Sequence, residues 1–107
     1  MTFLIQCHYR PGGAEDRLTF RRAHIEHMLA WLPATVFGAA ILESNGVTPA
    51  GMVVALNVGS VEEAESFVAQ EPYCKAGLFQ RIVINPMVQM TPPYTREVLE
   101  TELARSS

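Results

Sequence analysis

The segment Met52–Val58 constrains the fold of this chain most, because it is apolar in a nearly continuous run. Side chains of a strand alternate between its two faces, so residues 52–56 place apolar groups on both faces. Such a strand needs cover on both sides. Helices can cover one face, and a second subunit is the most economical cover for the other. We therefore expect a homodimer whose sheets pack face to face.

Proline and glycine positions, together with hydrophobic periodicity, divide the chain into strands and helices. The expected strands are residues 2–9, 36–42, 52–58 and 79–90, and the expected helices are residues 16–32, 60–70 and 94–105, with a short helical turn at 72–78. The order strand, helix, strand, strand, helix, strand is the split βαβ arrangement of ferredoxin-like domains. The sequence thus predicts an α+β fold with a four-stranded antiparallel sheet and an extra C-terminal helix.

Three local signals sharpen the element boundaries. Pro33 ends the first helix, because proline disfavours helical geometry in the residue before it. Ser60 and Glu63 have the spacing of a capping box at the start of the second helix. Pro86 cannot donate a hydrogen bond to a neighbouring strand, which predicts an edge position or a bulge for the last strand.

The first expected helix is amphipathic. Its apolar positions recur at helical spacing and are Leu18, Ile25, Met28, Leu29 and Leu32. With Ile25 at the centre of the apolar face, His24 lies at the flank of that face and His27 points well away from the core. Phe20 and Trp31 lie on the His24 side of this projection. Pocket walls and subunit interfaces both favour such aromatic residues, so the two roles stay equally open.

The composition indicates one globular domain and excludes several functions. The 107 residues are 49% hydrophobic and 18% charged, so the chain can bury a core. The 8 basic and 11 acidic residues give a net charge of −3, which argues against a nucleic-acid surface. No segment approaches the roughly 20 apolar residues of a membrane span, and no secretory signal is visible. Cys7 and Cys74 have no CxxC spacing, so we expect a cytoplasmic protein.

His24 and Glu71 are the candidate catalytic residues. If the fold brings them together, the carboxylate accepts the imidazole N–H and fixes its tautomer. The other ring nitrogen can then remove a proton as a general base. In the alternative interpretation, His24 is a buried helix histidine and Glu71 is a helix-end charge or a surface ion pair.

Arg21 and Tyr73 are candidates for substrate binding. Arg21 suits a carboxylate or phenolate, and Tyr73 can donate to a developing oxyanion. The alternatives are a solvated arginine and a packed aromatic residue. A metal site is not expected: His24 and His27 are three residues apart, but no third ligand stands at a recognisable spacing. Nothing favours a heme or another cofactor.

Four segments resemble the YciI-like (YCII-related) family of the dimeric α+β barrel superfamily: residues 17–25, 60–64, 71–78 and 84–86. The resemblance covers about residues 2–88, so we divide the chain into a YciI-like domain, 1–90, and a C-terminal extension, 91–107. It implies a small dimer with an active-site pair, His24 and an aspartate whose place Glu71 takes here. Leu42–Asn45 stand where the family usually carries Gly-Pro.

Relatives in this family include lyases that remove HCl from chlorinated hydroxyquinols, and the wider superfamily includes muconolactone isomerases, heme-degrading monooxygenases and cofactor-free quinol oxygenases. A shared fold does not choose among these reactions. Our first hypothesis is a cofactor-free lyase or isomerase of a small polar or aromatic metabolite, with His24 as base and Glu71 as its orienting carboxylate. The second is a ligand-binding or interaction module that uses the same cleft without turnover.

Overall fold

The computed structural model describes residues 1–106, and its elements follow the expected order. The strands are β1 (Thr2–Tyr9), β2 (Thr35–Leu42), β3 (Pro49–Asn57) and β4 (Phe79–Met87). The α-helices are α1 (Gly13–Asp16), α2 (Arg21–Trp31), α3 (Val61–Gln70), α4 (Pro72–Lys75) and α5 (Arg96–Arg105), and the 3-10 helices are η1 (Arg17–Phe20) and η2 (Leu32–Ala34). Among the described residues, no helix is long and apolar enough to cross a membrane.

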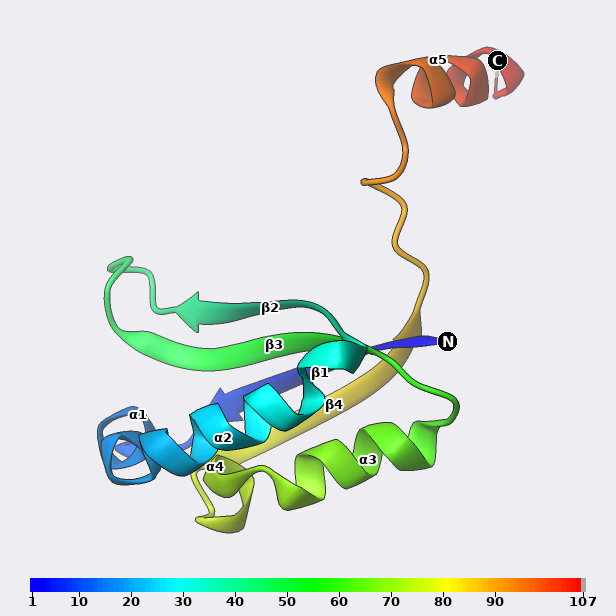
Figure 1. Ribbon diagram of the computed structural model, residues 1–107. Helices are drawn as coiled ribbons and strands as arrows, with labels where there is room; N and C mark the ends of the chain where they lie inside the picture. Colours follow the sequence, from blue (N-terminus) through cyan, green and yellow to red (C-terminus); the bar gives the residue numbers. More distant parts are fainter. Residues whose placement is uncertain (107) are drawn as a thin grey trace.

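The four strands form one antiparallel sheet in the order β2-β3-β1-β4. Helices α2 and α3 lie on one face of this sheet (Figure 1). In register, Ile5 of β1 lies opposite Val54 of β3 and Ile84 of β4. β4 is an edge strand, which is where a proline such as Pro86 is tolerated. The α+β ferredoxin-like fold expected from the sequence is confirmed.

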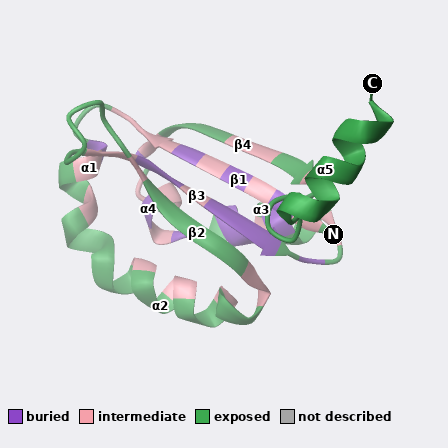
Figure 2. Cartoon of the chain, turned by 90° about the horizontal axis from the view of Figure 1, so that it is seen from above, coloured by how far each residue is buried: buried purple, intermediate pink, exposed green. Residues whose placement is uncertain are grey.

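The core lies between the sheet and α3. Its largest fully buried apolar side chains include Ile5, Val54, Leu56, Phe67 and Leu78. Buried residues concentrate on the central strands β1 and β3, whereas the edge strand β2 is mostly exposed (Figure 2). Burial of each large side chain of this kind contributes about 1.5–3 kcal/mol, so the central strands and α3 hold most of the fold together.

Helix α3 begins where the sequence predicts. The Ser60 hydroxyl accepts a hydrogen bond from the Glu63 amide at 3.3 Å, as in a capping box. Four residues after the end of α4, the chain turns into β4. Gly77, with φ of +71°, allows this turn because a residue without Cβ adopts a left-handed conformation at little cost.

The expected helix 16–32 is wrong in two respects. It is interrupted at Phe20 (φ −105°, ψ 5°), so α2 begins only at Arg21. Its orientation also differs, because Ile25 is 42% exposed and the His27 ring instead lies 4.8 Å from the Phe67 ring. The helical wheel was centred on the most apolar line of the helix. Contacts of Trp31 and His27 with Phe67 set the actual rotation, and they turn the apolar line outward.

The sheet face opposite the helices is apolar around β2 and β3. Phe37 and Ala39 of β2 pair with Ala55 and Val53 of β3 on this face. Phe37 remains 39% exposed. This is the second apolar face that the run at residues 52–56 predicts.

Helix α5 stands off the rest of the molecule on an extended arm, residues 88–95, on the side of the uncovered sheet face (Figure 1). The radius of gyration is 16.4 Å, compared with about 13 Å for a compact domain of this length. The arm therefore accounts for the elongated shape.

Candidate functional site

Glu71 is held at the junction of α3 and α4. Pro72 follows it, which favours extended backbone at Glu71 and suits the first position of a helix. One carboxylate oxygen, Oε2, accepts hydrogen bonds from the backbone amides of Tyr73 (2.8 Å) and Cys74 (3.1 Å). Glu71 is only 1% exposed. The carboxylate is thus buried with its hydrogen-bonding capacity used, as an N-cap of α4.

His24 approaches the second oxygen of the same carboxylate. Its Nδ1 atom lies 2.5 Å from Glu71 Oε1, across 47 residues of sequence. An ionised carboxylate has no proton to give, so the ring donates through Nδ1–H and Nε2 carries the lone pair. The His24 side chain is 17% exposed. The pair therefore has the geometry in which a carboxylate sets the tautomer of a histidine and leaves Nε2 for a ligand.

The ring of Tyr73 lies flat against His24. The two rings stack with centroids 4.2 Å apart and an angle of 9° between their planes. Burial raises the pKa of the Tyr73 hydroxyl, and the charges of Arg17 and Arg21 oppose that rise. Stacking fixes the imidazole plane, while the carboxylate fixes its tautomer. Arg21 is close enough for its charge to act on the Tyr73 hydroxyl, so the two predicted binding residues lie near each other.

A hollow of about 310 Å³ lies beside His24, between α2 and the strands β2 and β3. Its lining consists of His24, Met28, Gly38, Ala39, Ala40, Met52, Val53 and Val54. Gly38 and Ala40 pair with Val54 and Met52, so they belong to the sheet face that the helices cover. Their small size leaves the space open next to the imidazole. This is the size of a small-ligand pocket.

Phe20 and Trp31 lie outside this hollow. Phe20 lines a separate shallow depression with Ala23 and Pro72. Trp31 points toward α3, where its ring meets the Phe67 ring edge-on at 5.4 Å. The wheel projection placed both near His24, and the break before Arg21 explains the difference for Phe20.

The sequence did not identify three features of the site. The small residues Gly38, Ala39 and Ala40 in a strand were a usable signal, because such residues in a strand mark a place where something else comes close. Arg17 and Tyr9 affect the pKa and the packing of Tyr73 only through tertiary structure, so no local sequence pattern predicts them. Tyr9 is edge-on to Tyr73 with ring centroids 6.3 Å apart.

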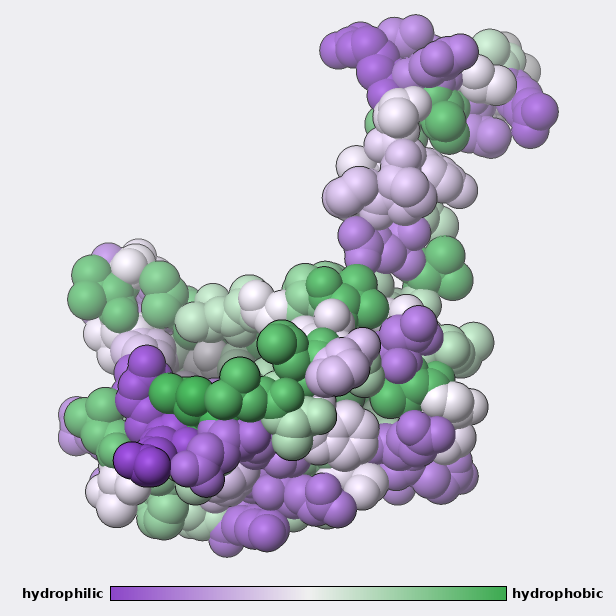
Figure 3. Space-filling view, in the orientation of Figure 1, coloured by the Kyte–Doolittle hydropathy of each residue, from purple (hydrophilic) through white to green (hydrophobic). Residues whose placement is uncertain are grey.

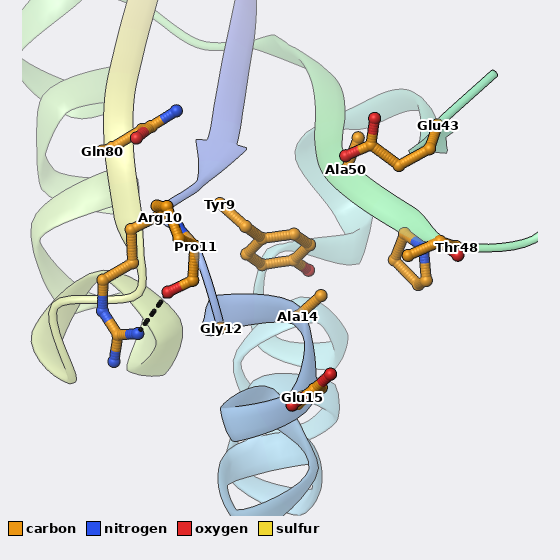
Figure 4. A pocket seen from close by; sticks show the side chains of 11 residues that line it. Tyr9, Arg10, Pro11, Gly12, Ala14, Glu15, Glu43, Thr48, Ala50 and Gln80 are labelled. Carbon is orange, nitrogen blue, oxygen red and sulfur yellow. Dashed lines mark hydrogen bonds between the residues drawn. The ribbon is translucent and has the colours of Figure 1, made fainter.

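Tyr9 also lines a second, more polar hollow of about 310 Å³ at the end of β1 (Figure 4). Arg10, Glu15, Glu43 and Thr48 contribute its polar groups. The Arg10 guanidinium donates to the Pro11 carbonyl there at 3.1 Å. Burial raises the pKa of the Tyr9 hydroxyl, so this phenol stays protonated near neutral pH. Neither His24 nor Glu71 lines this hollow.

The remaining reactive groups are placed to be inert. Burial, with the charge of Glu71 next, raises the pKa of the Cys7 thiol to about 12, and burial also raises the pKa of Cys74. Thiolates are therefore scarce near neutral pH. Within the described part of the chain, no three His, Cys, Asp or Glu side chains cluster in a way that would hold a metal ion.

The antiparallel sheet, the helices on one of its faces and the small hollow beneath them define the class: the chain has the fold of the dimeric α+β barrel superfamily. No protein-family profile matches the chain, and no curated protein matches it in sequence. Among solved structures, it is similar to 5-chloro-2-hydroxyhydroquinone dehydrochlorinase (TftG) from Burkholderia phenoliruptrix AC1100, in complex with 2,5-dihydroxybenzoquinone. The TM-score is 0.76 and the identity 26%, over 83% of this chain and 95% of that one.

A second similar structure is a putative antibiotic biosynthesis monooxygenase from Bacteriodes thetaiotaomicron VPI-5482. Here the TM-score is 0.54 and the identity 16%, over 89% of this chain and 93% of the other. At that identity the likeness concerns the fold alone.

Proposed function

We propose that this chain is a YciI-like lyase or isomerase that acts on a small polar or aromatic metabolite without a cofactor. His24 is the general base, and Glu71 orients it. Arg21 and Tyr73 bind the developing negative charge of the substrate. Phe20 and Trp31 support the site from outside the hollow, Trp31 by holding α2 against α3.

The contact between His24 Nδ1 and Glu71 Oε1 at 2.5 Å carries this proposal. It leaves Nε2 as the only ring nitrogen for proton transfer. Within residues 1–106, no protein hydrogen bond to Nε2 accompanies this contact. General-base catalysis by a positioned histidine contributes typically 10²–10⁴-fold to a rate, so its loss is easy to measure.

The hollow beside His24 supports a planar substrate. Apart from His24, its lining side chains are apolar, and the small residues Gly38 and Ala40 leave room for a flat ligand. In the reaction we propose, Nε2 takes a proton from an acidic O–H or C–H of the substrate. The freed electron pair then forms a new double bond. In an elimination this expels a leaving group, such as chloride, and in an isomerisation another carbon of the substrate takes the proton back from the protonated His24.

The likeness to a dehydrochlorinase supports elimination over the other reactions of this superfamily. That neighbour was crystallised with a dihydroxybenzoquinone, a planar ligand with two acidic oxygens. A planar ligand of this kind suits the hollow that His24 borders, whereas Tyr73 and Arg21 lie outside the lining of that hollow and act on the ligand through the His24 side of the site.

The test measures chloride release from 5-chloro-2-hydroxyhydroquinone and the absorbance of the quinone product. We expect turnover by the wild type and a loss of about 10²–10⁴-fold in kcat for His24→Asn, with KM little changed. Glu26→Gln, an exposed carboxylate on the same helix, is the matched control and retains activity. Ala40→Leu fills the hollow and should prevent binding while the histidine pair stays intact.

A non-catalytic ligand-binding module is the second candidate. The observation that favours it is the set of three hydrogen bonds on Glu71, which would tie α2 to α4 even in a protein without activity. A wild type that binds the probe in the hollow but converts neither it nor enolisable carbonyl compounds would favour this candidate.

We also propose that the protein is a homodimer and cytoplasmic. The uncovered apolar sheet face, with Phe37 39% exposed, is the surface on which a second copy would pack. Cys7 and Cys74 are both free, which suits a reducing compartment.

A further inference from the structure

Helix α5 stands away from the sheet, and its apolar side is exposed (Figure 1). Val98, Leu99 and Leu103 are 39%, 48% and 72% exposed. The helix is only ten residues long, although Thr95 caps its start. Isolated helices shorter than about 12–15 residues are marginal in water, so α5 needs a surface to pack against.

A matching surface exists on the outer side of α2. Ile25, Leu29 and Leu32 are 42%, 62% and 60% exposed along it. Apolar side chains gather along α2 at the front of the molecule (Figure 3). This line, called here the outer stripe of α2, is the one that the sequence predicts to be buried. Two unpartnered apolar helix faces in one small chain indicate that they cover each other or a common partner.

The charges at the two faces are opposite. Arg21 and Arg22 stand at the N-terminal end of α2, beside Ile25. Helix α5 carries three glutamates: Glu97, Glu100 and Glu102. Arg96 pairs with Glu100 and Arg105 with Glu102 on α5, and Arg22 pairs with Glu26 on α2. With histidines neutral, the two arginines and one glutamate of α2 give it a net charge of +1, and the two arginines and three glutamates of α5 give it −1. The opposite net charges favour contact between the two helices.

The position of the arm decides whether α5 can reach α2 of its own chain or α2 of a second copy. Within one chain, α2 lies beneath the sheet, whereas the arm rises from the opposite side (Figure 1). Residues 88–95 span at most about 26 Å, at about 3.3 Å per residue. In a dimer with facing sheets, the partner's sheet lies about 10 Å above and its helices about 10 Å further. The arm is long enough to reach the partner's helix layer, and α5 itself, ten residues and about 15 Å long, extends the reach to the outer side of that layer.

We propose that α5 of one copy docks on the outer stripe of α2 in a second copy of this chain, in a reciprocal exchange of arms. The proposal rests on the facing-sheet dimer proposed above. It gives each arm a function in the other subunit, because α2 carries His24. The arm of one subunit then holds the helix that presents the base of the other.

Disulfide cross-linking of the double variant L29C/L103C tests the exchange. We expect oxidation to give a covalent dimer on a denaturing gel, with a peptide linking positions 29 and 103 by mass spectrometry. The matched control L29C/V47C places its second cysteine on the exposed Val47, in the loop before β3, and should give no such dimer. The wild-type protein shows how much cross-linked dimer the native Cys7 and Cys74 form by themselves.

Sedimentation of the uncross-linked protein separates the remaining outcomes. Leu99→Asp with Leu103→Asp should weaken the dimer at least about tenfold if the arms are exchanged. A cross-linked monomer would place α5 on its own α2 and overturn the exchange. A dimer without a 29–103 link overturns the exchange and leaves the facing-sheet dimer standing. A monomeric wild type overturns the arm exchange and the facing-sheet dimer. None of these results decides whether His24 is a catalytic base, which the chloride-release assay tests separately.

Discussion

Helix α3 buries Ala64, Phe67 and Val68, whereas α2, on the same face of the sheet, buries no residue fully. Helix α3 has a side-chain cap, Ser60, and α2 has none. The apolar side of α3 turns toward the core and that of α2 turns away from it. Two neighbouring helices thus meet the sheet in different ways.

The difference shows what holds each helix. Burial of apolar surface fixes α3. A few directed contacts fix α2: the hydrogen bond of His24 with Glu71, and the ring contacts of His27 and Trp31 with Phe67. A helix held in this way leaves a hollow on its inner side, where a small molecule can meet His24. Stability resides mainly in α3, and the candidate chemistry resides in α2.

The largest expected effect comes from Phe67. Phe67→Ala removes a fully buried ring that α2 also rests on, so the free energy of unfolding should fall by about 3–5 kcal/mol in urea denaturation. Met28→Ala is the matched change on α2. Met28 is partly buried and already borders the hollow, so the loss should be about 1–2 kcal/mol. Equal losses would contradict the division of roles between the two helices.

The next effect concerns the carboxylate that joins α2 to α4. In Glu71→Gln, the side chain presents one acceptor and one donor group to three donors: Nδ1 of His24 and the amides of Tyr73 and Cys74. The amide oxygen can keep the two backbone donors, so His24 must either lose its hydrogen bond or shift its hydrogen to Nε2 and accept from the amide NH2, at a cost of up to about 1–3 kcal/mol in the free energy of unfolding.

Nitrogen-15 spectra of the imidazole measure a second effect of this substitution, the change in the tautomer of His24. In mildly alkaline buffer the wild type should show the hydrogen of His24 on Nδ1, and Glu71→Gln should reduce that tautomer. Glu62→Gln, an exposed carboxylate in the first turn of α3, is the control and should change neither measurement. An unchanged tautomer in Glu71→Gln would mean that the carboxylate does not set the imidazole.

A smaller effect comes from the helix caps. Ser60→Ala removes the hydroxyl that accepts from the Glu63 amide and should lower the free energy of unfolding by about 1 kcal/mol. Thr95→Ala removes the same kind of cap from α5. Because α5 stands apart from the sheet, this change should leave the unfolding of the body within about 0.5 kcal/mol of wild type. A full-sized loss for Thr95→Ala would show that α5 is part of the same cooperative unit.

The smallest expected effect is the pH dependence that His27 adds. Burial lowers the pKa of His27 below its usual value of 6.5, and its Nε2 atom is buried without a hydrogen-bond partner. The folded state therefore prefers the neutral ring. This contribution to stability is complete above the unfolded pKa and is lost as the pH falls through the lower folded pKa. Urea midpoints between about pH 7.5 and pH 5 should fall less in His27→Gln than in wild type, and parallel curves would contradict this.

Local sequence signals foretold most of the fold. Pro33, Pro86 and the Ser60–Glu63 spacing give boundaries and an edge strand that agree with the structure, because each acts through the backbone of its own neighbourhood. The apolar run at residues 52–56 likewise implies two faces to cover. The pairing of Glu71 with His24 was expected from the resemblance to a family, and its contact is present in the structure. The small residues that open the hollow, Gly38 and Ala40, are also a local signal, but the sequence does not say what lies against them.

The rotation of α2 was beyond the sequence. A helical wheel ranks faces by hydropathy, and Ile25 and Leu29 form the most apolar line of this helix. Tertiary structure placed His27 and Trp31 inward because Phe67, 36 residues beyond Trp31, offers aromatic contacts that no local pattern encodes. The sequence by itself determined the order of strands and helices, since turns, caps and alternation are local. Tertiary structure decided which side of α2 faces the hollow, since that depends on packing between distant segments.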